Sequence, residues 1–114
     1  MVVGWDWTPE QVDRLFHALA DATRRDIAMA TFESPRSVSE LARRYPMSFA
    51  AVQKHVAVLA AAGIVTKQRH GREVLVTGDI DAFRRAVALL AEYEAMWRRR
   101  LDRFETVLDE DEGE

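Results

Sequence analysis

The chain has 114 residues, enough for one modest domain, and it contains no cysteine, which excludes disulfides, thiolate metal sites and thiol catalysis. Hydrophobic residues make up 48% and charged residues 31% of the sequence, a balance typical of a water-soluble globular protein. There is no apolar run long enough to cross a membrane and no secretory signal pattern at the N-terminus, so we expect a cytoplasmic protein without a membrane partner.

The formal net charge of -3 conceals an uneven distribution of charge along the chain. Five carboxylates lie in residues 109–114, whereas residues 34–72 carry seven Lys or Arg side chains and a single Glu. Because the local field rather than the total charge governs phosphate binding, we expect the middle third of the chain to attract a polyanion. We expect residues 109–114 to form a disordered acidic tail.

The N-terminal third predicts two helices joined by a short turn. Thr8 stands three residues before Gln11, which is the spacing of a capping box at the start of a helix. Asp21 predicts the N-cap of a second helix, which we expect to end near Phe32. Residues 19–25 are therefore the expected junction between the two helices.

A short helix and a longer one follow, separated by a tight turn. Ser37 is the expected cap of the short helix, and Pro46 ends it because the residue before a proline disfavours helical dihedral angles. Ser48 is the expected cap of the longer helix, predicted over residues 48–62, and Gly63 provides the left-handed residue that often follows a helix. This arrangement is the helix-turn-helix pattern.

The helix predicted over residues 48–62 has one apolar and one polar side. Val52, Val56 and Leu59 recur at helical spacing and predict the buried side. The opposite side carries small, amide and cationic residues, and no Asp or Glu occurs from Ser48 to Thr66. Since a solvated helix face normally mixes both signs of charge, this side of the helix is predicted to bind a polyanion. The second helix of a helix-turn-helix lies in the major groove, so double-stranded DNA is the polyanion that we expect.

Candidate DNA contacts lie on this helix and on a hairpin that follows it. Residues 65–70 and 73–77 favour strands and flank a glycine-containing turn, which predicts a β-hairpin, or wing, with a basic tip. The candidate DNA-binding residues are Ser48, Ala50, Gln53, Lys54, His55, Lys67, Arg69 and Arg72. Further candidates for backbone contacts are His70, Arg43, Arg44 and Ser37.

Each candidate has a chemical reason and a simpler alternative. Gln53 matches adenine in a bidentate pair, and Lys54 can reach guanine. Ser48 and His55 are better suited to phosphates, Ser48 because helix N-termini favour anions. The alternatives are an ordinary solvated helix face, a His55 that only covers the edge of the core, and a wing tip that is a solvated turn.

The last part of the chain predicts one long helix from about Ile80 to Leu108. Its apolar residues recur with an average spacing of about 3.5 residues, the coiled-coil period. A domain this small cannot bury the whole stripe, so we expect the helix to pair with the same helix of a second chain. The predicted dimer-interface residues are Leu90, Tyr93, Trp97, Leu101 and Phe104. The alternative is that Trp97 and its neighbours line a ligand pocket.

Three stretches, residues 16–31, 37–76 and 91–108, together resemble the ArsR/SmtB-type family of bacterial winged-helix repressors. The resemblance rests on LADATRR in the first stretch, on the pattern SxxxVxKHVxxLxxAGIV and the GRE of the wing in the second, and on AEYEAMWRRRLDRFETVL in the third. It implies a homodimer that binds a palindromic operator, often in its own promoter, and is released by an inducer.

The chain differs from the metal-sensing members of the ArsR/SmtB-type family. Those members often carry a cysteine pair on the helix before the turn, or histidine and carboxylate ligands on the last helix. Residues 39–44 contain no thiol, and the last helix contains no histidine. Zinc or arsenic sensing in those modes is therefore excluded, no metal or cofactor is predicted, and the chain resembles a cysteine-free branch whose inducers are varied or unknown.

The sequence thus predicts a mainly α protein with a small β-hairpin: a winged helix-turn-helix over residues 1–108 with a long C-terminal dimerisation helix. We expect a homodimeric transcriptional repressor rather than an enzyme, since no nucleophile elbow, phosphate loop or HExxH motif occurs. Two alternatives remain open. One is a protein-interaction module that works through the long helix, and the other is a repressor with a small-molecule inducer pocket between the first and last helices.

Overall fold

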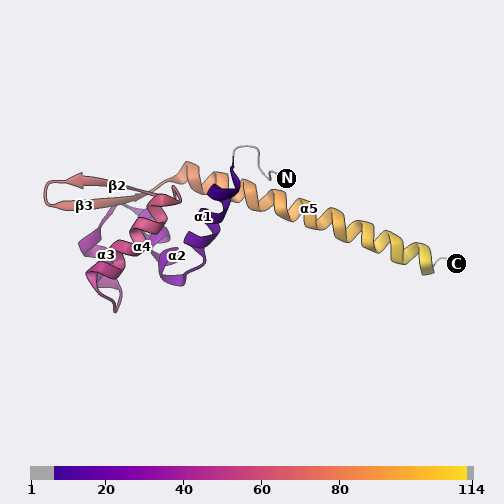
Figure 1. The fold of residues 1–114 in the computed structure, drawn as a ribbon, viewed down its shortest axis with the longest axis horizontal. Helices are drawn as coiled ribbons and strands as arrows, with labels where there is room; N and C mark the ends of the chain where they lie inside the picture. The colour runs from indigo at the N-terminus through magenta and orange to yellow at the C-terminus, as the bar shows by residue number, and fades with distance from the viewer. Residues whose placement is uncertain (1–6, 113–114) are drawn as a thin grey trace.

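The computed structural model describes residues 7–112, which form a small helical domain from which one long helix extends (Figure 1). The molecule measures 73 × 30 × 23 Å along its principal axes. Its elements in chain order are α1 Pro9–Leu19, α2 Ala22–Glu33, β1 Arg36–Ser37, α3 Val38–Arg44, α4 Phe49–Ala61, β2 Val65–His70, β3 Glu73–Gly78 and α5 Ile80–Glu112. Among the described helices, none is long and apolar enough to span a membrane.

The helices begin where the capping signals of the sequence place them. Thr8 Oγ1 accepts a hydrogen bond from the Gln11 N–H at 3.1 Å, and the Gln11 side chain accepts one from the Thr8 N–H at 2.9 Å, which confirms the capping box. Asp21 caps α2 by accepting a hydrogen bond from the Arg24 N–H, and Ser48 caps α4 by accepting one from the Ala51 N–H. Gly63 follows α4 with a φ of 78°, the left-handed conformation predicted for it.

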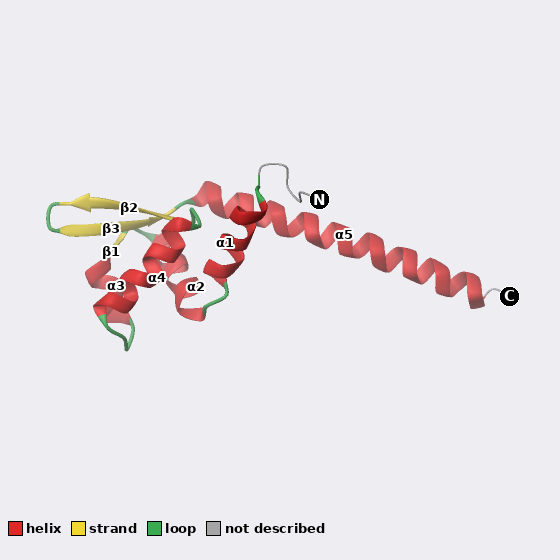
Figure 2. Ribbon diagram, viewed as in Figure 1, coloured by secondary structure: helices red, strands yellow, loops and turns green. Residues whose placement is uncertain are grey.

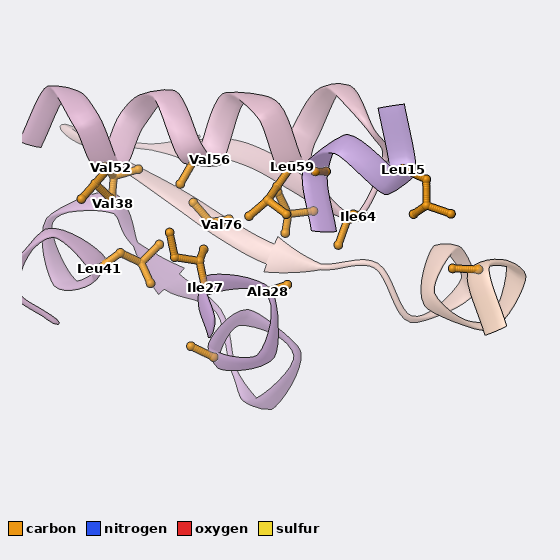
Figure 3. Close-up of a cluster of buried hydrophobic side chains, with 14 of the residues drawn as sticks. Leu15, Ile27, Ala28, Val38, Leu41, Val52, Val56, Leu59, Ile64 and Val76 are labelled. Atoms are coloured by element: carbon orange, nitrogen blue, oxygen red, sulfur yellow. The ribbon is translucent and has the colours of Figure 1, made fainter. Parts of the chain in front are cut away.

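One apolar core joins helices α1 to α4 and the start of α5 to the sheet (Figure 3). The predicted buried side of α4 is confirmed, because Val52, Val56 and Leu59 are each at most 1% exposed. Their neighbours in the core come from the other elements and include Leu15, Ile27, Val38, Leu41, Ile64 and Val76. This core fixes α4 in place and so decides which of its side chains face outward.

The sheet contains three strands rather than the two predicted (Figure 2). The order is β1-β3-β2 with all neighbours antiparallel, and β1 adds Arg36 opposite Val76 and Ser37 opposite Leu75. The sequence suggested only a break before Ser37, because two residues are too few to show the alternation of a strand. The extra strand anchors the base of the wing to the start of α3.

Helix α5 is longer than predicted and extends well beyond the rest of the domain (Figure 1). It continues to Glu112, so residues 109–112 are helical rather than part of a disordered tail, and residues 113–114 lie outside the described part of the chain. The physical reason is that no helix breaker occurs before Gly113 and that glutamate is a good helix former.

Candidate nucleic-acid interface

Helix α4 presents a polar face that is exposed along its first two turns. Ser48, Ala50, Gln53 and Lys54 are all exposed, and we call these four residues the recognition face. The face is outward because successive helical residues are rotated by about 100° and the apolar side is held in the core. No acidic residue lies in the first turn of α4, so the positive end of its dipole is uncompensated.

The turn between α3 and α4 is tied to helix α2. The Met47 N–H donates to the Tyr45 carbonyl at 2.9 Å, and the Tyr45 hydroxyl donates to Asp26 Oδ2 at 2.5 Å. Burial and this bond to the Asp26 carboxylate raise the pKa of Tyr45 to about 12. Tyr45 therefore stays a neutral donor under ordinary conditions, and the helix-turn-helix is held against α2.

The wing places three predicted basic residues at the surface. Strands β2 and β3 pair from Val65 opposite Gly78 to His70 opposite Glu73, and Gly71 turns the chain with a φ of 61°. Lys67, Arg69 and Arg72 are exposed, as is His70. None of these four forms an ion pair within residues 7–112, so the charges of Lys67, Arg69 and Arg72 are available to a polyanion.

The register of the wing shows which side of the sheet two of these cations occupy. Lys67 lies opposite Val76, and Arg69 lies opposite Val74. Residues directly opposite each other in an antiparallel pair share a face, so both cations lie on the face of the buried Val76. That face packs on the core to which α4 belongs, so the wing adds positive charge on the side of α4.

Two predicted contacts have surroundings different from those expected. Ser37 is only 2% exposed, and its hydroxyl accepts a hydrogen bond from the Glu40 N–H at 3.0 Å, so the prediction that it contacts DNA is wrong. It is the cap of α3, and burial keeps it from solvent. His55 is half-buried and lies on a different side of α4 from the recognition face, near the junction of α1 and α2.

An arginine that the sequence did not single out connects His55 to that junction. Arg24 Nη1 lies 3.2 Å from His55 Nδ1. Its Nε donates to the Ala18 carbonyl and its Nη2 to the His17 carbonyl, both at 2.9 Å. In the sequence Arg24 stood out only as part of LADATRR, three residues after the N-cap Asp21, and neither feature reveals that its side chain reaches α4.

A second exposed surface runs along α5. Ala86 and Leu89 face the domain and are at most 6% exposed. The predicted interface residues, which we call the α5 stripe, follow Ala86 along the same side of the helix but are exposed; their exposed fractions are 49% for Leu90, 38% for Tyr93, 59% for Trp97, 44% for Leu101 and 62% for Phe104. Near the domain the stripe meets α1, where the rings of Phe16 and Tyr93 lie 6.2 Å apart.

A cavity of about 250 Å³ lies between α1, α2 and the start of α5. Its lining is apolar and includes Leu15, Phe32, Ile64, Phe83, Ala86 and Leu90. Trp97 does not line this cavity; it lies further along α5, beside Tyr93, Met96 and three arginines. The predicted location of an inducer pocket, between the first and last helices, is therefore hollow and apolar.

The described residues provide no cluster of three or more His, Asp or Glu side chains that could hold a metal ion. The three histidines belong to α1, α4 and β2, which separates them in the fold as in the sequence.

Comparison with known proteins agrees with this geometry. A family model described as "Bacterial regulatory protein, arsR family" matches residues 21–67. The HTH-type transcriptional regulator Rv2034 of Mycobacterium tuberculosis is 34% identical over 97 residues, which are 85% of this chain and 88% of that protein. The HTH-type transcriptional repressor SmtB of the same species is 43% identical over 61 residues, which are 54% of this chain and 45% of that protein.

A solved structure adds a similarity in three dimensions. An ArsR-like transcriptional regulator from Rhodococcus sp. RHA1 is 31% identical and has a TM-score of 0.74, with 86% of this chain and 92% of that chain covered. All of these relatives are named as regulators of transcription, and none is named as an enzyme. The same order of helices, turn and wing thus recurs in proteins named for regulation.

Proposed function

Since the chain belongs to the ArsR family of bacterial regulatory proteins, and is a DNA-binding transcriptional regulator with a winged helix-turn-helix, we propose that it is a homodimeric repressor of a two-fold symmetric operator. The observation that carries the proposal is the recognition face: an exposed, carboxylate-free side of α4 beside a basic wing. Such a surface suits a polyanion with readable base edges.

Affinity and specificity come from different parts of this surface. Lys67, Arg69 and Arg72 on the wing neutralise phosphates and release counterions, which supplies affinity without sequence information. Gln53 and Lys54 project from α4 and carry the donors and acceptors that match adenine and guanine edges in the major groove. The exposed Ser48 at the helix N-terminus adds a phosphate contact.

A second copy of the chain provides the second half of the site. The α5 stripe supports this, because an apolar stripe this long is unusual on a monomer and marks an interaction surface. A two-fold axis near the paired α5 helices would place two recognition faces on successive major grooves. Regulation then consists of changing the distance between the two α4 helices.

Selection of bound duplexes from a random-sequence pool tests the proposal. We expect a palindromic consensus with half-sites centred about one helical turn of DNA apart, or a multiple of it, and two protein chains per duplex. The Gln53→Ala variant should yield a relaxed consensus from the same pool. An enriched site without two-fold symmetry, or one chain per duplex, would contradict the dimeric arrangement.

The apolar cavity favours a second function for the same protein, release from DNA by a small apolar molecule. Apart from Arg25, every residue that lines it is apolar, so the ligand class is hydrocarbon-like or aromatic. Titration of an anilinonaphthalene dye onto the DNA complex should release the duplex, and Ala86→Phe, which fills the cavity, should abolish that release. Dye binding that leaves the complex intact would contradict an inducer site here.

A further inference from the structure

We propose that Arg24 is a positioning residue for DNA binding: it holds the imidazole of His55 in the tautomer with its proton on Nε2, and so prepares a donor on α4 for a DNA phosphate. The inference rests on the proposed DNA-binding function and deepens it. It assigns a role to an arginine outside the recognition face and wing, and it explains how the half-buried His55 can take part.

The Arg24 side chain bridges three elements of the domain. It starts on the first turn of α2, where the Asp21 carboxylate accepts from the Arg24 N–H at 3.0 Å. Its guanidinium then meets the last two turns of α1 through the carbonyls of His17 and Ala18. The remaining nitrogen, Nη1, reaches His55 on α4. The guanidinium is thus fixed on both sides before it contacts the imidazole.

The chemistry of this contact sets the tautomer of His55. A guanidinium has donors only and stays protonated in proteins, so the Arg24–His55 contact at 3.2 Å requires Nδ1 to be the acceptor. A neutral imidazole that accepts at Nδ1 carries its proton on Nε2. Within residues 7–112, Nε2 makes no hydrogen bond to the protein, which leaves it free to donate to a ligand.

The position of His55 favours a phosphate as that ligand. His55 directly follows Lys54 of the recognition face, and it lies on the side of α4 that borders the α1–α2 junction. The carboxylate of Asp21 is nearby but already caps α2, and hydrogen bonds and the charge of Arg24 lower its pKa. A neutral Nε2–H donor and a fixed cation behind it suit an anionic oxygen.

The tautomer is measured directly by NMR on the free protein. Long-range nitrogen–proton spectra of nitrogen-labelled protein at about pH 8, where a histidine is ordinarily neutral, distinguish the two ring forms. We expect His55 to show the Nε2–H pattern in the wild type and in Arg25→Ala, and a mixture in Arg24→Ala. Arg25 is the matched control, because it donates to the Leu19 carbonyl of α1 at 2.6 Å.

A double-mutant cycle on DNA affinity tests the coupling. Because a phosphate contact does not depend on base sequence, a duplex of arbitrary sequence at low salt is sufficient. We expect Arg24→Ala and His55→Ala each to weaken binding by about threefold to tenfold, the value of one hydrogen bond, and the double variant to lose no more than one of them. Arg25→Ala should lose less than either.

Three results would overturn the inference. An Nδ1–H tautomer in the wild type would exclude the bond, and independent losses in the cycle would show that Arg24 acts by its charge or through the fold. A salt slope lowered by about 1 in Arg24→Ala would mean that Arg24 itself binds a phosphate. Failure of the proposed function can be distinguished from failure of this inference. A wild type that binds no duplex would exclude DNA binding, whereas the tautomer of His55 is measured on the free protein and does not depend on DNA.

Discussion

Helices α4 and α5 are both amphipathic, but the chain buries the apolar side of only one of them. On α4 the apolar residues Val52, Val56 and Leu59 are at most 1% exposed, and the polar side faces outward. Among residues 80–110 of α5 only Ala86 and Leu89 are buried, and the α5 stripe is exposed. The apolar side of α4 is therefore covered by its own domain, whereas the apolar stripe of α5 is not covered.

This difference indicates two kinds of ligand for one chain. The outward side of α4 bears one amide and one cation, Gln53 and Lys54, and no carboxylate, so its complement is an anion with hydrogen-bonding edges. The outward side of α5 bears aromatic and aliphatic residues, so its complement is another apolar surface. Some substitutions should impair DNA binding by α4 without affecting dimerisation through α5, or the reverse. Others test the contacts that join the two regions.

The largest expected effect is that of Trp97→Asp on the α5 stripe. An ionised carboxylate replaces the largest side chain of the stripe, so we expect the dimer to weaken by about 4 kcal/mol or more, roughly a thousandfold. Sedimentation equilibrium measures this. Ala95→Asp is the matched control, since Ala95 lies on the opposite side of α5 and should leave the dimer intact. A Trp97→Asp variant that sediments as a dimer would place the interface elsewhere.

The next effect is expected at the junction of the two regions, where β3 leads into α5. A Cβ on Gly78 would overlap the ring of Phe32, which packs edge-on against Phe83 of α5 at 5.3 Å. Gly78→Ala should therefore lower the free energy of unfolding by about 3 kcal/mol, measured by urea denaturation. The same change in a Phe32→Leu background should cost less, and an equal cost in both backgrounds would refute the clash.

Gln53→Ala tests the recognition face alone. We expect it to weaken binding to the selected operator by about 1–3 kcal/mol and to relax the sequence preference at one position of each half-site. The dimer should be unaffected, because Gln53 is on the exposed side of α4. Competition binding with operator and random duplexes measures both quantities, and an equal loss on the two duplexes would show that Gln53 does not read a base.

Arg72→Ala tests the wing and has a smaller effect that is independent of sequence. Loss of one phosphate contact should weaken binding to all duplexes similarly and reduce the slope of log affinity against log salt by about 1. Arg103→Ala on α5 removes the same charge far from α4 and should leave the slope unchanged. Equal salt slopes for the wild type and Arg72→Ala would show that Arg72 at the wing tip does not contact a phosphate.

The smallest effect is expected from Asp21, which joins α2 to the surroundings of His55. Its hydrogen bond to the Arg24 N–H is the main cause that holds the pKa of this carboxyl below its ordinary value of 3.8. A lowered pKa stabilises the fold above that ordinary value, and this contribution is lost as pH falls below it. Asp21→Asn keeps the cap but removes the charge, so thermal unfolding should show a slightly flatter loss of stability in acid. If Asp21→Asn loses stability in acid as steeply as the wild type, the Asp21 charge does not contribute to the pH dependence of stability.

Much of the fold could be predicted because its signals are local. Thr8, Asp21 and Ser48 each bond a backbone N–H three residues on, so their caps are written in short segments. Gly63 could be predicted for the same reason, because ending α4 in the left-handed conformation depends only on its own φ. The spacing of Val52, Val56 and Leu59 identified the buried side of α4, because a helix converts sequence spacing directly into a face.

What could not be predicted depends on contacts between distant segments. Strand β1 exists only because β3 lies beside it, and Ser37 is buried by that pairing. The Arg24 side chain contacts His55, which is 31 residues away in the sequence, and no local sequence pattern predicts such a contact. Which residues of α5 the domain covers also needed the fold, since Ala86 and the α5 stripe lie on the same side of the helix and differ only in exposure.

The central claim, that α4 and the wing bind DNA, is tested most directly by the salt dependence of duplex affinity. The account predicts a steep linear fall of log affinity with log salt, with a slope of about -0.9 for each phosphate neutralised. A flat response, or no binding to any duplex at low salt, would contradict it and favour a module that binds other proteins through α5.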